Sequence, residues 1–167
     1  MIFDFVKHSE CPKELLNNIC LLKSQYWHYS IQKQIEWMNR NISQNDVHLI
    51  LKNEETIIAY LAITKGKIQI DDSRGNEFLG IGNVCVDKNY LKQEYGFLIM
   101  KIAEFYIKQN RKIGLLLCQE NNVLFYKKGN WLLHNGNTYI CEEKFDHFLF
   151  YYNVATLGKK VVLSKAF

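Results

Sequence analysis

The stretch Leu79–Trp131 reads LGIGNVCVDKNYLKQEYGFLIMKIAEFYIKQNRKIGLLLCQENNVLFYKKGNW and predicts alternating strands and helices. The expected order is a strand at Gly82–Val86, a turn at 87–92, a helix at 93–110, a strand at Ile113–Cys118 and a short helix at 121–128. The second strand is apolar throughout, as is typical of a strand covered on both faces. Two such strands joined by a helix are parallel and need a right-handed crossover, so the stretch predicts a βαβ unit.

The helix at 93–110 is predicted to bury two neighbouring apolar ridges at i, i+4 spacing. Their members are Leu98, Ile102 and Phe105 on one ridge and Ile99, Ala103 and Tyr106 on the other. The opposite, polar face carries Lys101, Glu104, Lys108 and Gln109. The start of this helix presents backbone N–H groups and the positive end of the helix dipole, which suits a phosphate group.

Three short motifs lie in this order: Val84-Cys85-Val86 ends the first strand, Gly96 lies in the first helical turn, and Leu124-Phe125-Tyr126 precedes Gly129 and Trp131. This arrangement resembles the GNAT superfamily of acyl-CoA-dependent N-acetyltransferases. The resemblance extends back to residue 47, because VHLILKNEETIIAYLAITKGKIQI has the hairpin pattern that precedes the core in that family. Among the members, the spacing looks most like the aminoglycoside 2'-N-acetyltransferase type.

The resemblance implies an α/β (α+β) fold in one domain spanning residues 1–167. Its mixed central sheet would have about six or seven strands, flanked by helices, with the two parallel central strands splayed apart. The implied reaction moves an acetyl group from acetyl-CoA directly to a primary amine, such as that of an amino sugar. Two alternatives stay open: a catalytically weak or inactive relative that serves as a binding or regulatory module, and an enzyme for a protein or peptide amine.

The turn that would bind the pyrophosphate of acetyl-CoA departs from the family pattern R/Q-x-x-G-x-G/A. In the preferred register Leu91 and Glu94 replace the first two motif residues and only Gly96 is kept, while Tyr90 occupies a usually aromatic position. A second register begins at Gln93. The carboxylate of Glu94 would repel a pyrophosphate unless it faced solvent or paired with a nearby lysine. The resemblance implies these cosubstrate-binding residues: Val84, Cys85, Val86, Lys92, Gln93, Glu94, Tyr95, Gly96, Phe97, Asn121 and Asn122.

Tyr126 matches the family tyrosine that protonates the leaving thiolate of CoA. The alternative is an ordinary core aromatic residue. No general base is evident, because the central-strand positions 80–83 hold Gly-Ile-Gly-Asn, which cannot accept a proton usefully at neutral pH. Glu77, Glu120 and His28 are more distant candidates, and a water chain would remove the need for a base.

The aromatic segment Gln25–Tyr29 joins two predicted helices, one opened by Ser9 and Pro12 and one capped by Ser30. In the family this loop borders the acceptor pocket, which makes Tyr26, Trp27, His28 and Tyr29 candidate substrate-binding residues. Alternatively, the aromatic rings simply cover the sheet.

The remaining segments predict further strands. These are Ile2–Val6, a hairpin at 46–70 that turns at Asn53–Glu55, strands at 138–141 and 147–154, and an edge strand at Val161–Leu163. Asn135-Gly136-Asn137 is a hairpin turn signal. Asp71, Asp72 and Glu77 lack the spacing of a metal site and predict a solvated loop, so no metal is expected.

Composition narrows the classes of partner. The 167 residues suit one domain with a real core, and the net charge of +4, without a basic run, argues against a nucleic-acid partner. Five cysteines without C-x-x-C spacing make a disulfide framework or a zinc site unexpected. No signal peptide or apolar run of 18 residues is visible, which predicts a cytoplasmic protein with no membrane partner. The expected partner is a small-molecule amine, and a homodimer is possible.

Overall fold

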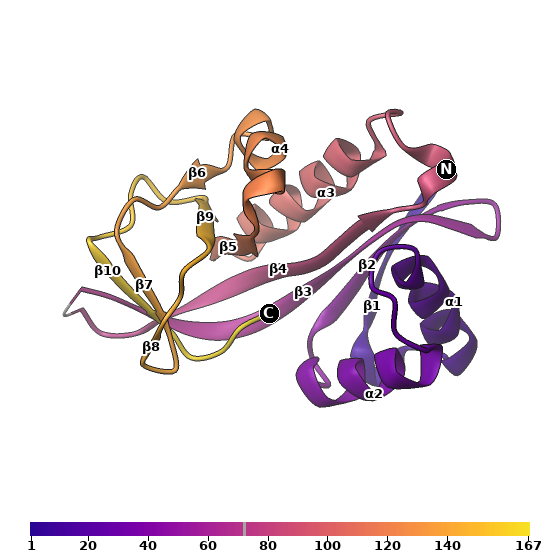
Figure 1. Ribbon diagram of the computed structural model, residues 1–167, viewed down its shortest axis with the longest axis horizontal. Coiled ribbons are helices and arrows are strands. Elements are labelled where there is room, and N and C mark those ends of the chain that lie inside the picture. The colour runs from indigo at the N-terminus through magenta and orange to yellow at the C-terminus, as the bar shows by residue number, and fades with distance from the viewer. Residues whose placement is uncertain (72) are drawn as a thin grey trace. The chain divides into compact units, whose positions relative to one another are not determined.

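The described residues, 1–71 and 73–167, form four α-helices and ten strands in the computed structural model (Figure 1). The helices are α1 (Lys13–Ser24), α2 (Ile31–Asn41), α3 (Tyr95–Gln109) and α4 (Val123–Lys128). The strands are β1 (Ile2–Lys7), β2 (Val47–Asn53), β3 (Thr56–Ile70), β4 (Asn76–Val86), β5 (Ile113–Cys118), β6 (Leu132–Leu133), β7 (Asn137–Ile140), β8 (Glu143–Lys144), β9 (Phe148–Tyr152) and β10 (Lys160–Leu163). The chain divides into a first unit of residues 1–64 and 82–103 and a second unit of residues 65–81 and 104–167.

In the first unit, β1, β2 and the beginning of β3 form an antiparallel sheet. Ile2 lies opposite Lys52 in the β1–β2 pair, and Val47 lies opposite Ile63 in the β2–β3 hairpin. Glu54 makes the hairpin turn with a φ of 53°, which confirms the predicted turn. Helices α1 and α2 cover this sheet (Figure 1), and their apolar ridges form one core with the strands. The fully buried members of this core include Ile19, Cys20, Met38, Ile50, Tyr60 and Ala62.

Both helices of the first unit begin where the sequence predicts. Pro12 precedes α1, where its fixed φ suits a helix start and its missing N–H costs nothing. Ser30 caps α2, since its Oγ accepts a hydrogen bond from the backbone N–H of Lys33 at 3.3 Å. The aromatic segment lies between the end of α1 at Ser24 and the start of α2 at Ile31.

In the second unit the strand order is β6-β9-β5-β4-β3-β10-β7-β8. The pair β4–β5 is parallel, from Phe78 opposite Ile113 to Ile81 opposite Leu116, which confirms the predicted βαβ unit. Beyond the last pair, β4 continues to Val86 and β5 to Cys118. Gly114 interrupts the apolar run of β5 because a Cβ there would lie 2.6 Å from the Cδ1 of Ile107 on α3.

Three details of the strand prediction are wrong. The sheet has ten strands among the described residues, more than the expected six or seven, and two of them, β6 and β8, are two-residue strands defined only by their partners. Residues 160–163 are not at an edge, since β10 lies between β3 and β7. Asn135–Asn137 does not join a hairpin, because β6 pairs with β9 while β7 pairs with β10 and β8.

The buried face of α3 is rotated from the predicted one. Ile99, Ala103 and Ile107 are buried, whereas Leu98 is 40% and Phe105 is 62% exposed. Glu104, expected on the polar face, is only 4% exposed, and it accepts a hydrogen bond from Nε1 of Trp131 at 3.1 Å. A buried tryptophan N–H needs an acceptor, and Glu104 supplies it from the buried face of the helix.

Candidate acceptor pocket and cosubstrate turn

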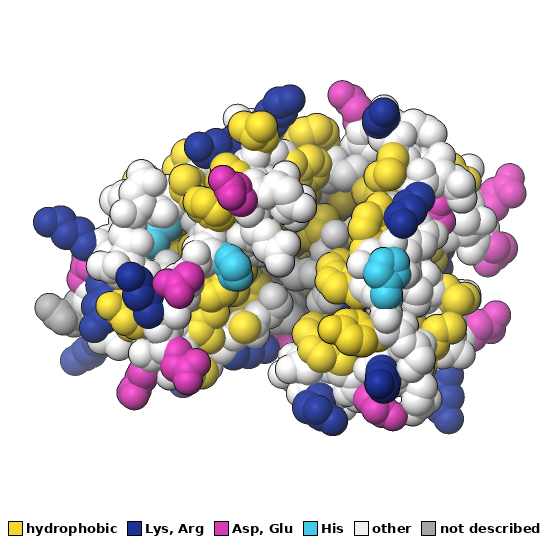
Figure 2. Space-filling view, in the orientation of Figure 1, with side chains coloured by type: hydrophobic (Ala, Val, Ile, Leu, Met, Phe, Trp, Pro, Cys, Tyr) yellow, Lys and Arg dark blue, Asp and Glu magenta, His cyan; other side chains and the backbone are white. Residues whose placement is uncertain are grey.

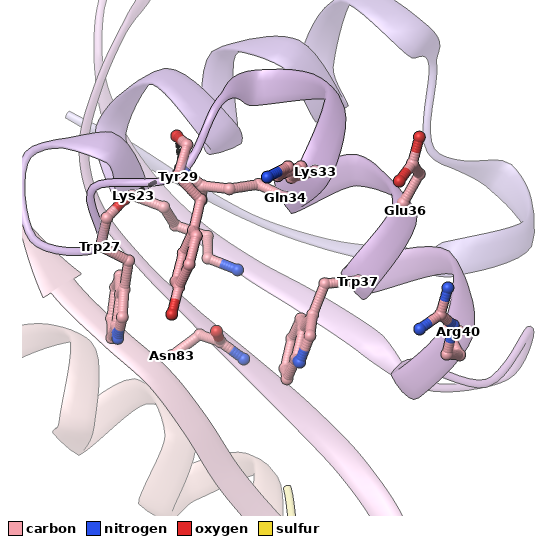
Figure 3. A pocket seen from close by; sticks show the side chains of 9 residues that line it. All are labelled: Lys23, Trp27, Tyr29, Lys33, Gln34, Glu36, Trp37, Arg40 and Asn83. Carbon is pink, nitrogen blue, oxygen red and sulfur yellow. Dashed lines mark hydrogen bonds between the residues drawn. The ribbon is translucent and has the colours of Figure 1, made fainter.

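A pocket of about 540 Å³ opens in the first unit between α1, α2 and β4 (Figure 3). Aromatic walls and charged or amide side chains alternate around it. The lining residues are Lys23, Trp27, Tyr29, Lys33, Gln34, Glu36, Trp37, Arg40 and Asn83. Its volume is in the range of small-molecule sites, and its mixture of aromatic walls and a few polar groups is typical of them.

Lys23, in the last turn of α1, is the most buried charged side chain of the pocket, with 3% of its surface exposed. Its Nζ lies 4.8 Å from the ring centroid of Trp37 and 5.7 Å from that of Trp27. Figure 3 shows this nitrogen between the two indoles, on the side of Asn83. Burial lowers the pKa of Lys23, and nearby Cys20 and Cys85 oppose the shift. The indole faces attract the cation and offset part of its lost hydration.

Gln34 of α2 fixes the aromatic wall. Its Nε2 donates to Oγ of Ser24 at 2.9 Å and to the backbone carbonyls of Trp27 and Tyr29, each at 3.3 Å. One buried amide thereby holds the end of α1 and the loop that follows it. The wall is therefore shaped before a ligand arrives, which lowers the cost of ordering it on binding.

The four predicted substrate-binding residues divide into two groups. Trp27 and Tyr29 line the pocket, whereas Tyr26 and His28 do not. The hydroxyl of Tyr26 donates to the carbonyl of Val86 at 2.5 Å, and Nζ of Lys88 lies 5.6 Å from its ring. His28 is exposed. Tyr26 therefore anchors the loop to the end of β4, while its neighbours form the wall.

The sequence analysis missed Lys23 and Gln34, although a signal was present. Lys23 follows Leu16 by seven residues and Cys20 by three, so it lies on the apolar ridge of α1. Gln34 lies three residues after Ile31 and four before Met38, on the apolar ridge of α2. A polar residue at a ridge position points into the interior, where it needs a partner or a cavity.

The predicted pyrophosphate turn is exposed and leads directly into α3 in the first unit. Lys92 and Glu94 have φ angles of 63° and 62°, in the left-handed region that favours glycine. The glycine-like angle at Glu94 supports the preferred register, because Glu94 replaces a motif glycine there. Glu94 is exposed, as is required if it is not to repel an anion. A helix leaves its first N–H groups without an acceptor inside the helix, so this turn fits a diphosphate.

The other residues predicted to bind the cosubstrate or to act in catalysis are divided between the two units. Val84, Cys85 and Val86 end β4 in the first unit, where Cys85 is buried and its pKa is raised to about 12 by burial. Asn121 and Asn122 lie in the second unit, exposed, in the short 3₁₀ helix Glu120–Asn122.

Tyr126 lies in α4 and is 8% exposed. Its ring contacts Phe125 and Phe150, with centroid distances of 5.1 and 5.8 Å. Burial raises the pKa of Tyr126 well above its usual range, with a smaller contribution from Cys118. The phenol therefore stays protonated at neutral pH, as a proton donor must, and the same packing also suits a core aromatic residue.

The distant base candidates are all exposed side chains. Glu77 pairs with Nζ of Lys112 at 2.5 Å, and this ammonium lowers the pKa of the carboxyl group. Glu120 and His28 are exposed as well. None of the three lines the pocket.

Among residues 1–71 and 73–167, no group of three His, Cys, Asp or Glu side chains is arranged to hold a metal ion. Asp72, one of the loop carboxylates named above, lies outside the described residues. No helix among the described residues is long and apolar enough to cross a membrane. On the face drawn in Figure 2, basic and acidic side chains are interspersed.

Several solved structures share this fold. Escherichia coli ElaA has 15% identity and a TM-score of 0.65, covering 90% of this chain and 99% of its own. An acyl-CoA N-acyltransferase from Pseudomonas aeruginosa has 14% identity and a TM-score of 0.65, with coverages of 90% and 97%. An aminoglycoside 6'-N-acetyltransferase complexed with coenzyme A has 11% identity and a TM-score of 0.63, with coverages of 90% and 94%. These similarities define the fold class.

The family follows from the sequence. The model of the acetyltransferase (GNAT) family matches residues 15–130, and the chain belongs to that family. The predicted fold class, the acetyl-transferring activity and acetyl-CoA as cosubstrate are thereby confirmed. A comparison with curated protein sequences found no match.

Proposed function

We propose that the protein transfers the acetyl group of acetyl-CoA to the primary amine of a small molecule held in the pocket of the first unit. The observation that carries this proposal is the pocket itself, where Trp27, Trp37 and the buried Lys23 meet Asn83 of β4. Asn83 comes directly before Val84–Val86, the strand end that the family resemblance assigns to acetyl-CoA. An acceptor in this pocket would therefore lie beside the strand that carries the thioester.

The proposed reaction is a direct transfer. The nitrogen of the neutral amine attacks the thioester carbonyl carbon, the carbon–sulfur bond breaks, the nitrogen loses one proton and the sulfur gains one. The products are an amide and CoA with a free thiol. Aligning two bound reactants supplies much of the rate, so few side chains are obligatory. No side chain of the pocket is assigned as base, and the acceptor has to react in its unprotonated form.

Tyr126 is proposed as the donor of the proton to sulfur, on the strength of its place in the family motif. A buried phenol with a raised pKa is a weaker acid than a thiol, whose pKa is about 8.5. Its contribution should therefore lie at or below the lower end of the roughly 10² to 10⁴ range for general acids.

Calorimetric titration with acetyl-CoA, followed by turnover measurements on Tyr126→Phe, tests the proposal. We expect binding by the wild type, and turnover about 10-fold or more lower in the variant with unchanged acetyl-CoA affinity and melting temperature. Tyr139→Phe, a matched change elsewhere in the second unit, should leave turnover unchanged. Absence of binding at millimolar acetyl-CoA would favour a binding or regulatory module. If Tyr126→Phe had the same turnover as the wild type, the protein would still be an enzyme, but Tyr126 would be a core packing residue and not the proton donor.

A further inference from the structure

The charges around the pocket are unequal. Three cationic side chains, Lys23, Lys33 and Arg40, line it together with one carboxylate, Glu36. Figure 3 shows the carboxylate of Glu36, in the middle of α2, pointing away from Lys23. The lining therefore favours an anionic ligand over a polycationic one.

Lys23 gives the strongest constraint on the charge of the ligand. Lysine is seldom fully buried unless an anion pairs with it, because its lost hydration has to be replaced. Among the described residues, no carboxylate forms an ion pair with Lys23. The faces of Trp27 and Trp37 replace only part of the hydration, and a ligand oxyanion would supply the rest.

The two indole rings also restrict the shape of the ligand. Trp27 and Trp37 come from different elements, the loop after α1 and helix α2, and they approach the same ammonium group. A ligand whose oxyanion reaches Lys23 must pass between aromatic surfaces, which favours a flat or apolar body next to the charged group.

We propose that the acceptor amine also carries an oxyanion, a carboxylate or a phosphate, that pairs with Lys23 while its flat or apolar body lies between Trp27 and Trp37. This inference rests on the proposed function, because it identifies the class of acceptor for the same pocket. It disfavours polycationic amines, including unmodified aminoglycosides, and narrows the amino-sugar expectation to sugars that bear an anion.

Matched pairs of amines that differ in one anionic group provide the test. Phenylalanine and phenethylamine differ by a carboxylate, and glucosamine 6-phosphate and glucosamine differ by a phosphate. Binding is measured by isothermal titration calorimetry on the wild-type protein. Transfer is followed separately, by release of the free CoA thiol. We expect at least one anionic member to bind about 10-fold or more tighter than its partner.

Lys23→Met is the decisive variant, and Lys13→Met, an exposed lysine at the start of the same helix, is its control. Lys23→Met should weaken binding of the preferred amine with an anionic group by at least about 30-fold, and should not weaken binding of its partner without that group by more than about 3-fold. Lys13→Met should change neither. If the Met variant fails to fold, Lys23→Gln removes the charge while keeping a polar group and has the same expected result.

Binding and transfer separate the two possible failures. Anion-selective binding that depends on Lys23, without any transfer, would support this inference and overturn the proposed function. Transfer to both members of each pair at equal rates would support the proposed function and overturn this inference. Equal losses of affinity for the members with and without the anionic group in Lys23→Met would also overturn it, since Lys23 would then only shape the pocket.

Discussion

Each unit buries a charged helical side chain against tryptophan, but the two charges contact opposite parts of the indole ring. In the second unit Glu104 accepts a hydrogen bond from the indole N–H of Trp131, which itself stacks on Tyr152 at a centroid distance of 5.3 Å. In the first unit Lys23 lies against the indole faces of Trp27 and Trp37. The edge of an aromatic ring is positive and its face negative, so each charge meets the complementary part.

The difference lies in what completes each site. The carboxylate of Glu104 meets a hydrogen-bond donor inside the protein, so this contact holds the second unit together. The ammonium of Lys23 meets ring faces beside a cavity, so its strongest possible partner has to come from outside. A buried charge that is paired within the chain therefore indicates a structural role. A buried charge that faces a cavity indicates a role in ligand binding.

The largest effect on stability is expected from Glu104→Ala. It leaves the Trp131 N–H buried without its acceptor and removes packed side-chain atoms, which should lower the free energy of unfolding by about 3 kcal/mol. Urea unfolding followed by circular dichroism measures this loss. Glu104→Gln keeps an acceptor and should lose clearly less. A loss below about 1 kcal/mol for the alanine variant would mean that the hydrogen bond is not structural.

Acid should weaken the first unit through a second buried group, His48. Its Nε2 lies 2.9 Å from Nδ1 of His8, and its Nδ1 lies 2.8 Å from the hydroxyl of Tyr60. Burial and the charges of His8 and Lys23 lower the pKa of His48 from 6.5 to about 4, while Asp46 acts in the opposite direction.

Because the unfolded chain takes up this proton first, the stability from His48 is complete above about pH 6.5. It is lost as the pH falls toward 4, by about 3 kcal/mol in total. Urea midpoints measured from pH 7 to 4 test this slope. His48→Phe should flatten it, and His147→Phe, a change at an exposed histidine, should not. An equally steep slope in His48→Phe would assign the acid sensitivity to other groups.

Lys23→Met should have the opposite sign to Glu104→Ala. Replacing a buried cation that lacks an anion by an apolar side chain of similar length should leave stability unchanged or raise it by about 1 to 2 kcal/mol. Because burial lowers the pKa of Lys23, any gain should be larger at neutral pH and shrink as the pH rises toward 10, where the unfolded lysine also loses its charge. Destabilisation by more than about 1 kcal/mol in ligand-free protein would make Lys23 a structural residue like Glu104.

Glu94→Gly should have the smallest effect on stability. Its φ of 62° costs a side chain about 1 kcal/mol that glycine avoids, although glycine gives back part of this gain through its freer unfolded chain. We expect a melting temperature that is equal or a few degrees higher, together with tighter binding of acetyl-CoA in calorimetry. Lys92→Gly relieves the same kind of backbone strain but removes a positive charge, so it should not tighten binding. Unchanged affinity in Glu94→Gly would place the diphosphate away from this turn.

The sequence predicted the elements whose signals are local. The apolar run of β5 gave its bounds, and Pro12 and Ser30 gave the starts of α1 and α2. It could not predict β6 and β8, because a two-residue strand exists only through its partner.

The roles of the polar residues Lys23 and Gln34 in the pocket, and of Glu104 beside Trp131, were not predicted for a physical reason. Lys23 and Gln34 lie at positions of the apolar ridges and Glu104 lies on the predicted polar face, but in each case only tertiary contacts show what the side chain meets. Of the four residues that the family resemblance predicted to bind substrate, Trp27 and Tyr29 line the pocket, and their contact with a substrate stays a prediction.

The loop of residues 25–29, which contributes Trp27 and Tyr29 to the pocket, is also tied to the segment leading into the turn before α3. Gln25 donates to the Asp87 carboxylate at 2.9 Å and accepts from the Lys88 N–H at 2.8 Å, and Tyr26 donates to the Val86 carbonyl. A shift of this loop on acceptor binding would therefore displace the backbone at 86–88 through these hydrogen bonds, and movement of that backbone would displace the loop. The affinities for the two reactants should then be linked thermodynamically, each raising or lowering the other by the same factor.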